Sequence, residues 1–519
     1  MKMTHTWWKQ KRMHNLLFLA VFAGLAWFFG YTETFLNPPQ SVHTWRQTNG
    51  LSMTQMYFQY DVPFLEPEIH NQISEDGLSG KTAGEFPVIY YFMAQVWKVT
   101  GKSECLFRLF HLVILFAGLF MLFLTVKRAT GNPVAGGFAS LLVYTSPMVI
   151  FYGPNFLPDV PSLAFVFMAW YFLYQYTLGR KYYLLWLSAI SFTLAISLKI
   201  TASLSFIAIG AWAVAELFLV KNKFRVLNFR LSHFIPFLSG LVLVAAWYLY
   251  VESYTSRFGG SFSHHGIWPV WNMTSEQFSR IIDSLDKIYF REFFWPPLQY
   301  ATLVVWLFML FNIKKLHPFL GYLLVIMPLG LLGILILWFQ VLEGHDYYMI
   351  TQIQVLVVVW AVFFYHLKDR KFMNHPAFMV VLVLLLAVLA GNGRHRHKSR
   401  YEGWMNEGYR MHMEALTEIE PMFRQWGIHP DDKVISIPDF SVNASLYYMG
   451  RRGYTDFASD FSKEEVFLKR IEQGARYLVI NDTTLLADPL VSGFTQHFKG
   501  EYRNVRVYDL QPYLENRGK

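Results

Sequence analysis

Long apolar runs, repeated along most of the chain, constrain its fold more than any other feature. A basic N-terminal stretch leads into an apolar run at 16–35, and further runs of roughly membrane-spanning length follow it. These lie at 103–126, 133–152, 160–178, 182–198, 203–220, 234–252, 298–313, 318–340, 349–367 and 375–391. The pattern predicts a polytopic α-helical membrane protein with about 11 transmembrane helices. Because no small-residue cleavage site follows the first run, we expect it to remain as a signal anchor.

The composition agrees with a membrane protein and excludes several other classes. Of the 519 residues, 54% are hydrophobic and 18% aromatic, and only 16% are charged, against about 25% in soluble domains. Such a chain is neither disordered nor collagen-like. The single cysteine, Cys105, excludes an intrachain disulfide and a cysteine-based metal cluster. The net charge of +9 is expected of basic cytoplasmic loops, so no nucleic-acid partner is needed to explain it.

The distribution of charge predicts the orientation in the membrane. With the N-terminus in the cytoplasm, the inside segments hold 17 Lys and Arg residues and one acid, Asp369. These segments are 2–14, 127–131, 179–183, 221–230, 312–317 and 366–374. Such an excess of basic residues is typical of cytoplasmic loops. It places the first outer loop, 36–102, and the C-terminal residues, 392–519, on the opposite side.

The outer segments differ in character. In the first outer loop, residues 88–99 form an amphipathic stretch suited to a helix in the membrane interface. Beyond the last span, strand-like runs at 433–438, 477–481 and 504–510 alternate with a helical run at 463–473. We therefore predict two domains, a transmembrane domain at 1–391 and an extracytoplasmic α/β domain at 392–519.

Polar side chains that could carry chemistry lie at span ends and in outer segments. A transporter or proton pump normally needs ionisable groups at mid-membrane, so we expect the site at the outer boundary instead. The first outer loop opens with His43, Arg46, Gln47 and Asn49. Arg46 can hold an anion, and Gln47 or Asn49 a sugar hydroxyl. An ordinary interfacial segment would explain the same residues.

Two carboxylates beside the predicted membrane surface are candidate bases. Glu85 precedes the aromatic stretch of the first outer loop, where partial desolvation would raise its pKa and suit it to accept a proton. Asp159 stands at the mouth of a span, where it could equally be a helix N-terminal acid.

A lysine and a dense polar cluster complete the set of candidates. Lys199 lies between two spans on the outer side, where it could bind phosphate or extend to the interface. His345, Asp346, Tyr347 and Tyr348 directly precede another span. An aromatic belt would explain the two tyrosines but not the histidine and the aspartate.

Through these residues the chain resembles the polytopic GT-C glycosyltransferases. It is most similar to the glycosyltransferase family 39 type, which includes protein mannosyltransferases and the lipid A aminoarabinose transferase. The resemblance covers roughly residues 16–391. It lies in Trp45-Arg46-Gln47, Glu85–Tyr91, Phe156–Asp159, Leu198-Lys199-Ile200 and His345–Tyr348.

The resemblance implies a function at the outer face of a bacterial inner membrane. A sugar would pass from a polyprenyl-phosphate donor to an extracytoplasmic glycan, lipid or protein by inverting single displacement. A carboxylate, Glu85 or Asp159, would act as the catalytic base. The remaining candidates would bind donor phosphate (Arg46, Lys199, His345 and Tyr348) or sugar and acceptor (His43, Gln47, Asn49, Asp346 and Tyr347). Metal dependence stays open, because some GT-C enzymes use a divalent metal and others do not.

In one respect the sequence departs from the family pattern, so two other functions are considered beside sugar transfer. Related transferases commonly carry an acidic pair in the first loop, whereas Arg46-Gln47 stands at the matching place and Asn49 where close relatives often carry Asp. Either the base has moved to Glu85 or Asp159, or the protein is a non-catalytic assembly partner. A transporter or flippase for a lipid-linked glycan intermediate is a further alternative, against which the shortage of polar residues within the spans argues.

Overall fold

The computed structural model describes residues 2–260, 266–286 and 290–515, and it divides into two compact units. Unit 1 comprises Met1–Phe35, Arg108–Trp247 and Gly266–His397. Unit 2 comprises Leu36–Phe107, Tyr248–His265 and Lys398–Lys519. The first outer loop and the C-terminal residues therefore share one unit, and the predicted domain boundary at 391/392 stays a prediction.

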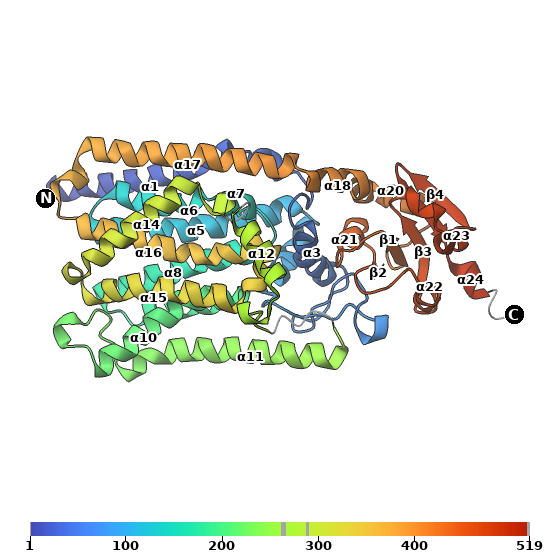
Figure 1. Ribbon diagram of the computed structural model, residues 1–519, viewed down its shortest axis with the longest axis horizontal. Helices are drawn as coiled ribbons and strands as arrows, with labels where there is room; N and C mark the ends of the chain where they lie inside the picture. Colours follow the sequence, from blue (N-terminus) through green and yellow to red (C-terminus); the bar gives the residue numbers. More distant parts are fainter. Residues whose placement is uncertain (1, 261–265, 287–289, 516–519) are drawn as a thin grey trace. The chain divides into compact units, whose positions relative to one another are not determined.

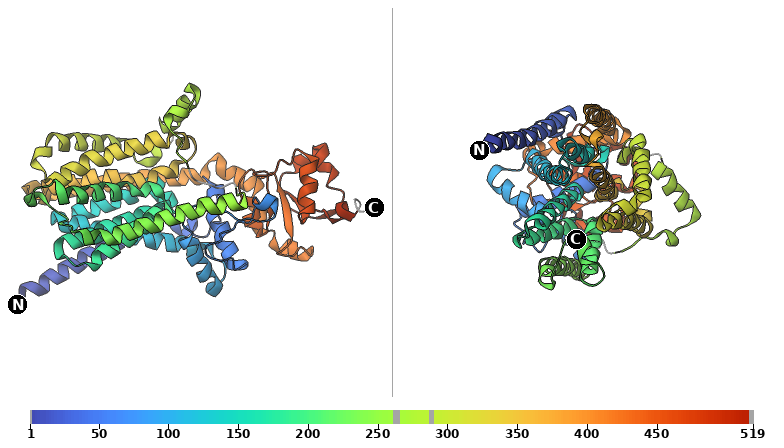
Figure 2. Two further views of the ribbon diagram at one scale, coloured as in Figure 1. Left: turned by 90° about the horizontal axis from the view of Figure 1, so that it is seen from below. Right: turned by 90° about the vertical axis from the view of Figure 1, so that its left-hand side faces the viewer.

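Unit 1 consists mainly of long apolar helices (Figure 1). They are α1 (Lys2–Phe28), α5 (Glu104–Thr130), α6 (Pro133–Tyr144), α7 (Pro147–Tyr152), α8 (Asp159–Gly179), α9 (Tyr183–Leu198), α10 (Leu204–Phe218), α11 (Ile235–Phe258), α14 (Pro296–Phe311), α15 (Pro318–Leu337), α16 (Ile353–Leu367) and α17 (Pro376–Glu402), several of which extend past the unit boundary. The predicted run at 133–152 is divided between α6 and α7, since Pro147 begins a new helix. Figure 2 shows most of these helices end-on, with similar axes.

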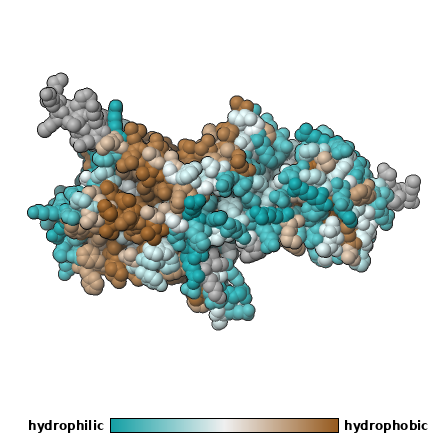
Figure 3. Space-filling model, turned by 90° about the horizontal axis from the view of Figure 1, so that it is seen from above, coloured by the Kyte–Doolittle hydropathy of each residue, from teal (hydrophilic) through white to brown (hydrophobic). Residues whose placement is uncertain are grey.

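The predicted helical membrane protein is confirmed at this level. Among the described residues, six helices are long and apolar enough to cross a membrane. They are Glu104–Thr130, Ile200–Phe218, Leu231–Phe258, Pro318–Leu337, Asp346–Leu367 and Pro376–His412. On the face shown in Figure 3, hydrophobic side chains gather over the helical part. The count of eleven spans and the orientation stay predictions.

An antiparallel hairpin of α8 and α9 positions the first group of candidate residues. The two helices are joined by a short turn in which Arg180 adopts the left-handed conformation, with a φ of 52°. Ser162 and Ser188 donate hydrogen bonds to carbonyls of the facing helix at 2.8 and 3.0 Å. Because α8 begins at Asp159 and α9 ends directly before Lys199, the hairpin brings these two residues to the same end.

Two 3-10 helices pack against each other beside this end of the hairpin. They are η2 (Ile200–Ser203) and η9 (Asp346–Gln352). The hydroxyls of Thr201 and Thr351 lie 2.8 Å apart, and the amide of Gln352 donates to the Thr201 carbonyl at 3.3 Å. These contacts place Tyr347 and Tyr348 next to the segment that carries Lys199.

A buried carboxylate holds the loop that follows α10. Glu216 is fully buried and accepts hydrogen bonds from the backbone amides of Val226, Leu227 and Asn228 at 2.6, 3.0 and 2.7 Å. The indole of Trp212, one turn earlier in α10, donates to the same side chain at 2.7 Å. One side chain thus satisfies the backbone donors of an otherwise irregular loop.

Replacing Glu216 by alanine should therefore destabilise unit 1 strongly. Each buried donor left without a partner costs about 1–3 kcal/mol, so the free energy of unfolding should fall by about 3–5 kcal/mol. Unfolding of the detergent-solubilised protein, followed by tryptophan fluorescence, measures the loss. The exposed Glu465→Ala change is the control, with an expected effect below about 0.5 kcal/mol. Equal stability of the two variants would contradict this role of Glu216.

Unit 2 combines helices of the first outer loop with a mixed five-stranded sheet. The helices are α3 (Thr44–Gln59) and α4 (Val88–Thr100). The sheet has the order β2-β1-β3-β5-β4, formed by β1 (Lys433–Ile437), β2 (Gly453–Tyr454), β3 (Ala475–Ile480), β4 (Phe498–Tyr502) and β5 (Val505–Asp509). Strands β1, β2 and β3 are parallel, and β4 and β5 pair in antiparallel fashion. Helix α22 (Glu464–Glu472) buries Phe467 and Ile471 in the core that covers this sheet.

Polar contacts join the first outer loop to the C-terminal residues within unit 2. Asn71 donates through its side-chain amide to the Val442 carbonyl and to the Thr455 hydroxyl, at 2.8 and 2.9 Å. The Tyr447 hydroxyl, on helix α21 (Ala444–Met449), donates to Glu104 at 2.6 Å. All of these residues except Glu104 are buried, so the contacts belong to the interior of the unit.

A buried histidine in the same interior makes unit 2 sensitive to acid. His70 is fully buried, its Nδ1 lies 2.8 Å from the Ser52 hydroxyl, and its backbone amide donates to that hydroxyl at 2.9 Å. Burial, with a smaller contribution from Lys102, lowers the pKa of His70 from 6.5 to about 3. The ring is therefore neutral in the folded protein at neutral pH.

The stability of unit 2 should fall as the pH decreases below 6.5. There the unfolded chain protonates His70 while the folded chain does not, so the free energy of unfolding drops by about 1.4 kcal/mol per pH unit, a loss that ends only near pH 3. His70→Gln should remove this slope between pH 6.5 and 5. Thermal unfolding across that range tests the prediction, and an unchanged slope in the variant would refute it.

Candidate functional site

A buried ion pair forms the centre of the candidate site in unit 1. The Lys199 Nζ lies 3.1 Å from Oδ1 of Asp159. The Asp159 side chain is fully buried, and that of Lys199 is 7% exposed. Each of these two buried charges stabilises the other, because burying either one without its partner would be strongly destabilising. The hairpin of α8 and α9 therefore presents a fixed, paired ammonium group.

Two tyrosines from η9 lie against the same ammonium group. The Nζ of Lys199 lies 4.0 Å from the ring centroid of Tyr348 and 5.1 Å from that of Tyr347. Cation–π contacts of this length stabilise a partly desolvated ammonium group. We call Tyr152, Asp159, Lys199, His345, Asp346, Tyr347 and Tyr348 the lysine cluster.

The other members of the lysine cluster contact one another or these two tyrosines. The Tyr152 hydroxyl donates to Oδ1 of Asp346 at 2.6 Å, and the two residues are buried. His345 places its ring edge-on against Tyr347 and Tyr348, with centroids 5.6 and 5.9 Å away. Its Nδ1 lies 3.1 Å from the Val341 carbonyl. Six residues predicted from three distant segments, Lys199 among them, thus come together.

Sequence reasoning missed two buried residues that support the lysine cluster. Tyr152 belongs to an apolar run rich in aromatic residues, and no signal separates it from its neighbours. Arg108 is a lone arginine near the start of another apolar run, which was a usable signal. Its guanidinium donates to the Pro154 carbonyl at 2.9 Å and lies 4.2 Å from the ring centroid of Phe156. Arg108 thereby anchors the segment that leads into Asp159.

In unit 2, Arg46 and Glu85 form an ion pair at the junction of α3 and α4. Their side chains are 11% and 16% exposed. The helices approach closely here, since a Cβ on Gly50 would lie 2.5 Å from the Tyr90 ring. Beside the pair lies a cavity of about 30 Å³, the space of a single water molecule. We call it the loop cavity; Arg46, Asn49, Gly50, Glu85 and Tyr90 line part of its wall.

The two predicted amides of the first outer loop make structural contacts. The Gln47 amide donates to the carbonyls of Gln40 and Val42 at 2.9 and 2.8 Å, which closes the turn before α3. Asn49 accepts a hydrogen bond from the Asn443 amide at 2.7 Å while also lining the loop cavity. Gln47 is not among the residues that line the loop cavity, and its role in sugar binding stays a prediction.

His43 lies at a second and larger cavity of unit 2. This residue precedes α3 in the left-handed conformation, with a φ of 55°. The cavity has a volume of about 520 Å³ and combines aromatic side chains with hydrogen-bonding groups. His43, Trp45, Tyr409, His412, Asp439 and Asp482 are among the residues that line it. We call it the His43 cavity. Burial raises the pKa of Asp439, whose carboxylate accepts hydrogen bonds from the amides of Ser441 and Ser445.

The described residues contain no group of three or more His, Cys, Asp or Glu side chains that could hold a metal ion. Asp159 and Glu85 instead face cations of the protein itself, Lys199 and Arg46.

Comparison with known proteins identifies the class of this fold. Residues 83–258 match the family model of dolichyl-phosphate-mannose-protein mannosyltransferase. This stretch contains Glu85, Asp159 and Lys199. The fold is similar to the apo crystal structure of ArnT from Cupriavidus metallidurans, with a TM-score of 0.58 at 13% identity over 95% of this chain and 97% of ArnT. The expected resemblance to GT-C glycosyltransferases is thus confirmed.

Two further solved structures have a similar fold, and another protein matches a short stretch of the sequence. The crystal structure of the same ArnT bound to undecaprenyl phosphate has a TM-score of 0.55 at 12% identity over 95% of this chain and 97% of ArnT. The apo oligosaccharyltransferase of Archaeoglobus fulgidus has a TM-score of 0.53 at 12% identity, over 93% of this chain and 73% of the enzyme. A stretch of 114 residues is 28% identical to an uncharacterized protein of Aquifex aeolicus (strain VF5), spanning 22% of this chain and 23% of that protein.

Proposed function

We propose that the protein transfers a sugar from a polyprenyl-phosphate donor to an extracytoplasmic acceptor in a bacterial inner membrane. The observation that carries this proposal is the lysine cluster. A buried ammonium group is held there by a carboxylate and two tyrosine rings. Such a preorganised cation suits the phosphate that leaves when a lipid-linked sugar is transferred. The similarity to an ArnT that was crystallised with undecaprenyl phosphate supports this class of donor.

The leaving phosphate is the proposed ligand of the lysine cluster. The N–H donors of an ammonium group suit phosphate oxygens, and Lys199 presents such a group in this cluster. Tyr348 lies within the same aromatic group and can add an O–H donor. Because Nδ1 of His345 faces the Val341 carbonyl, its Nε2 can donate to phosphate only when the ring is protonated. Asp346 and Tyr347 are the residues of this cluster that we assign to the sugar hydroxyls. Arg46 is the further cation that we assign to donor binding.

Glu85 is the carboxylate that we propose as the base. The oxygen of an acceptor hydroxyl would attack the anomeric carbon and form the new glycosidic bond. The bond from that carbon to the phosphate oxygen breaks, and the phosphate leaves with the electron pair. Glu85 takes the hydroxyl proton. Its side chain borders a cavity of hydroxyl size, whereas Asp159 is fully buried against Lys199. Attack from the face opposite the phosphate inverts the anomeric centre.

The acceptor is the component that we assign to the His43 cavity and to Asn49. Trp45 and Tyr409 offer aromatic surface, and His43 and Asp482 offer hydrogen-bonding groups. Amphipathic aromatic rings next to polar groups suit a sugar, whose faces are apolar and whose edges carry hydroxyls. A volume of about 520 Å³ lies within the range of small-molecule sites.

A donor and acceptor screen tests the proposal. Purified protein in liposomes is incubated with radiolabelled polyprenyl-phosphate sugars and with glycan, lipid and peptide acceptors. The proposal predicts a new glycosidic bond with at least one donor. Movement of the lipid-linked sugar across the bilayer without a new bond would instead support a flippase. If no donor binds and none reacts, the proposal is refuted.

A further inference from the structure

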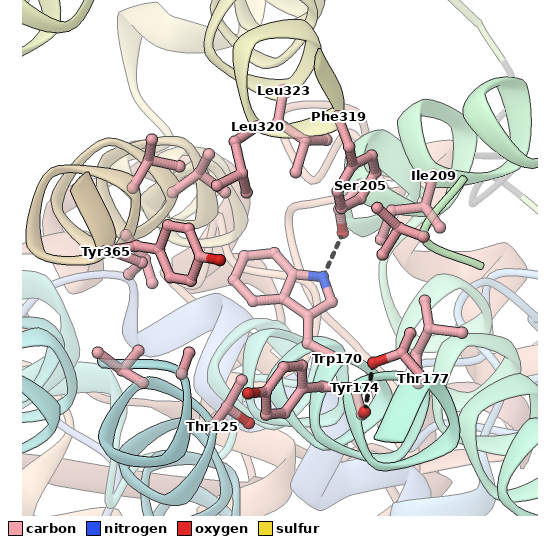
Figure 4. Close-up of a pocket in the computed structure, with 18 of the residues that line it drawn as sticks. Thr125, Trp170, Tyr174, Thr177, Ser205, Ile209, Phe319, Leu320, Leu323 and Tyr365 are labelled. Atoms are coloured by element: carbon pink, nitrogen blue, oxygen red, sulfur yellow. Dashed lines mark hydrogen bonds between the residues drawn. The ribbon is translucent and has the colours of Figure 1, made fainter. Parts of the chain in front are cut away.

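A large cavity in unit 1 takes no part in the proposed transfer. It has a volume of about 330 Å³ and lies among α5, α8, α10, α15 and α16 (Figure 4). Its wall is mostly apolar and includes Trp170, Ile209, Leu320, Leu323 and Tyr365. The residues that line it at one end, such as Val226 and His317, belong to loops that are rich in Lys and Arg.

Several polar atoms of the cavity wall already have partners within the protein. The Trp170 indole donates to the Ser205 hydroxyl at 3.0 Å, as Figure 4 shows. The Thr177 hydroxyl donates to the Tyr174 carbonyl at 2.7 Å, and the Thr125 hydroxyl to a carbonyl of its own helix at 2.8 Å. Water in this cavity would find few hydrogen-bond partners, and apolar cavities of about 150 Å³ remain dry and bind hydrocarbons. The wall therefore favours a hydrocarbon occupant.

Cations are attached to the same residues that border the cavity. Arg180 donates to the carbonyls of Val226 and Leu227, both of which line it. The Nζ of Lys368 lies 3.9 Å from the ring centroid of Tyr365, another lining residue. Arg128 donates to Gln175 at 2.6 Å, next to the lining residue Tyr174. Arg128 and Arg180 are themselves exposed, so their remaining donors can reach a ligand.

Few acids compete for these cations. The predicted inside segments contain only Asp369, beside Lys368. Glu216, which packs under the loop at 226–228, is occupied by the three backbone amides and the indole described above. A dry cavity bordered by cations therefore complements a molecule with a hydrocarbon chain and an anionic head.

We propose that this cavity holds one hydrocarbon chain of an anionic phospholipid, whose phosphate lies against Arg128, Arg180 and Lys368. The headgroup of the lipid would lie at the end of unit 1 that carries the basic loops. This proposal does not depend on the proposed transferase activity, because it rests on a different cavity and on residues outside the candidate site.

Native mass spectrometry of the full chain tests the proposal. The protein is prepared in liposomes of phosphatidylcholine with or without phosphatidylglycerol and released into a neutral detergent. Wild type should retain one phosphatidylglycerol in preference to phosphatidylcholine. The double variant Arg128→Gln/Lys368→Gln should retain it at least tenfold less. Lys371→Gln, which removes an exposed charge from the same loop as Lys368, should retain it like wild type.

A second variant separates lost binding from lost folding. Ala361 lines the cavity from α16, and Ala361→Phe places a ring inside it. This variant should bind no lipid although its rim cations are intact, and it should melt at or above the wild-type temperature in detergent. Equal retention of the two lipids by wild type, or unchanged retention by Ala361→Phe, would overturn the proposal.

Discussion

Lys199→Met is expected to stop sugar transfer and to lower the free energy of unfolding by about 3–5 kcal/mol. The ammonium group lies 3.1 Å from the carboxylate of Asp159, which is fully buried. Its removal leaves that charge without its lysine partner. The rate of transfer should fall by roughly 10²–10³ or more, the effect of removing one donor that stabilises a developing charge. Tryptophan fluorescence during unfolding and a radiolabelled transfer assay measure the two effects.

The double variant Asp159→Leu/Lys199→Met separates stability from chemistry. Replacing a buried ion pair by apolar residues of similar size is often neutral or stabilising. The double variant should therefore recover the unfolding free energy to within about 1–2 kcal/mol of wild type, and it should still transfer no sugar. A stable double variant with normal transfer would show that the pair has only a structural role.

Glu85→Gln should reduce the rate of transfer by about 10²–10⁴ while donor binding persists. The amide cannot take the proton of the acceptor hydroxyl, although it keeps the size of the carboxylate and can still bond to Arg46. The rate constant for a single turnover and the binding of radiolabelled donor lipid are measured on the same preparation. Loss of donor binding would instead mean that Glu85 acts by orienting Arg46.

The matched control for this prediction is Glu75→Gln. Glu75 is another acid of the first outer loop, 40% exposed and 4.0 Å from Lys81. It lines none of the cavities described above, so its variant should transfer sugar like wild type. If Glu85→Gln also transfers normally, the base lies elsewhere, and Asp159 becomes the candidate.

Local patterns in the sequence predicted most of the elements correctly. Apolar length alone indicates helices such as α8 and α15, and short runs rich in Val, Ile and Tyr indicate strands such as β1 and β5. The residues of the lysine cluster other than Tyr152 were also candidates from the sequence, because charges at the ends of apolar runs are conspicuous. Their mutual contacts were not predictable, since Asp159, Lys199 and Asp346 lie far apart along the chain.

The sequence alone could not show which polar side chains contact each other in the folded protein. Arg46 and Glu85 were expected to bind phosphate and to act as base, but nothing local shows that they bond to each other. Gln47 was expected to contact a sugar, whereas its amide is used by two nearby carbonyls. Tyr152 was missed because its only distinction is a hydrogen bond to Asp346, nearly two hundred positions later.

A single-turnover experiment with wild-type protein in liposomes tests the central claim most directly. Enzyme in excess over a radiolabelled polyprenyl-phosphate sugar is mixed with the acceptor found by the screen, and released polyprenyl phosphate and new glycoside are counted together. We predict equal amounts of the two products, an inverted anomeric centre, and neither product with Asp159→Leu/Lys199→Met. Appearance of the sugar-lipid on the other side of the bilayer with neither product formed would contradict it.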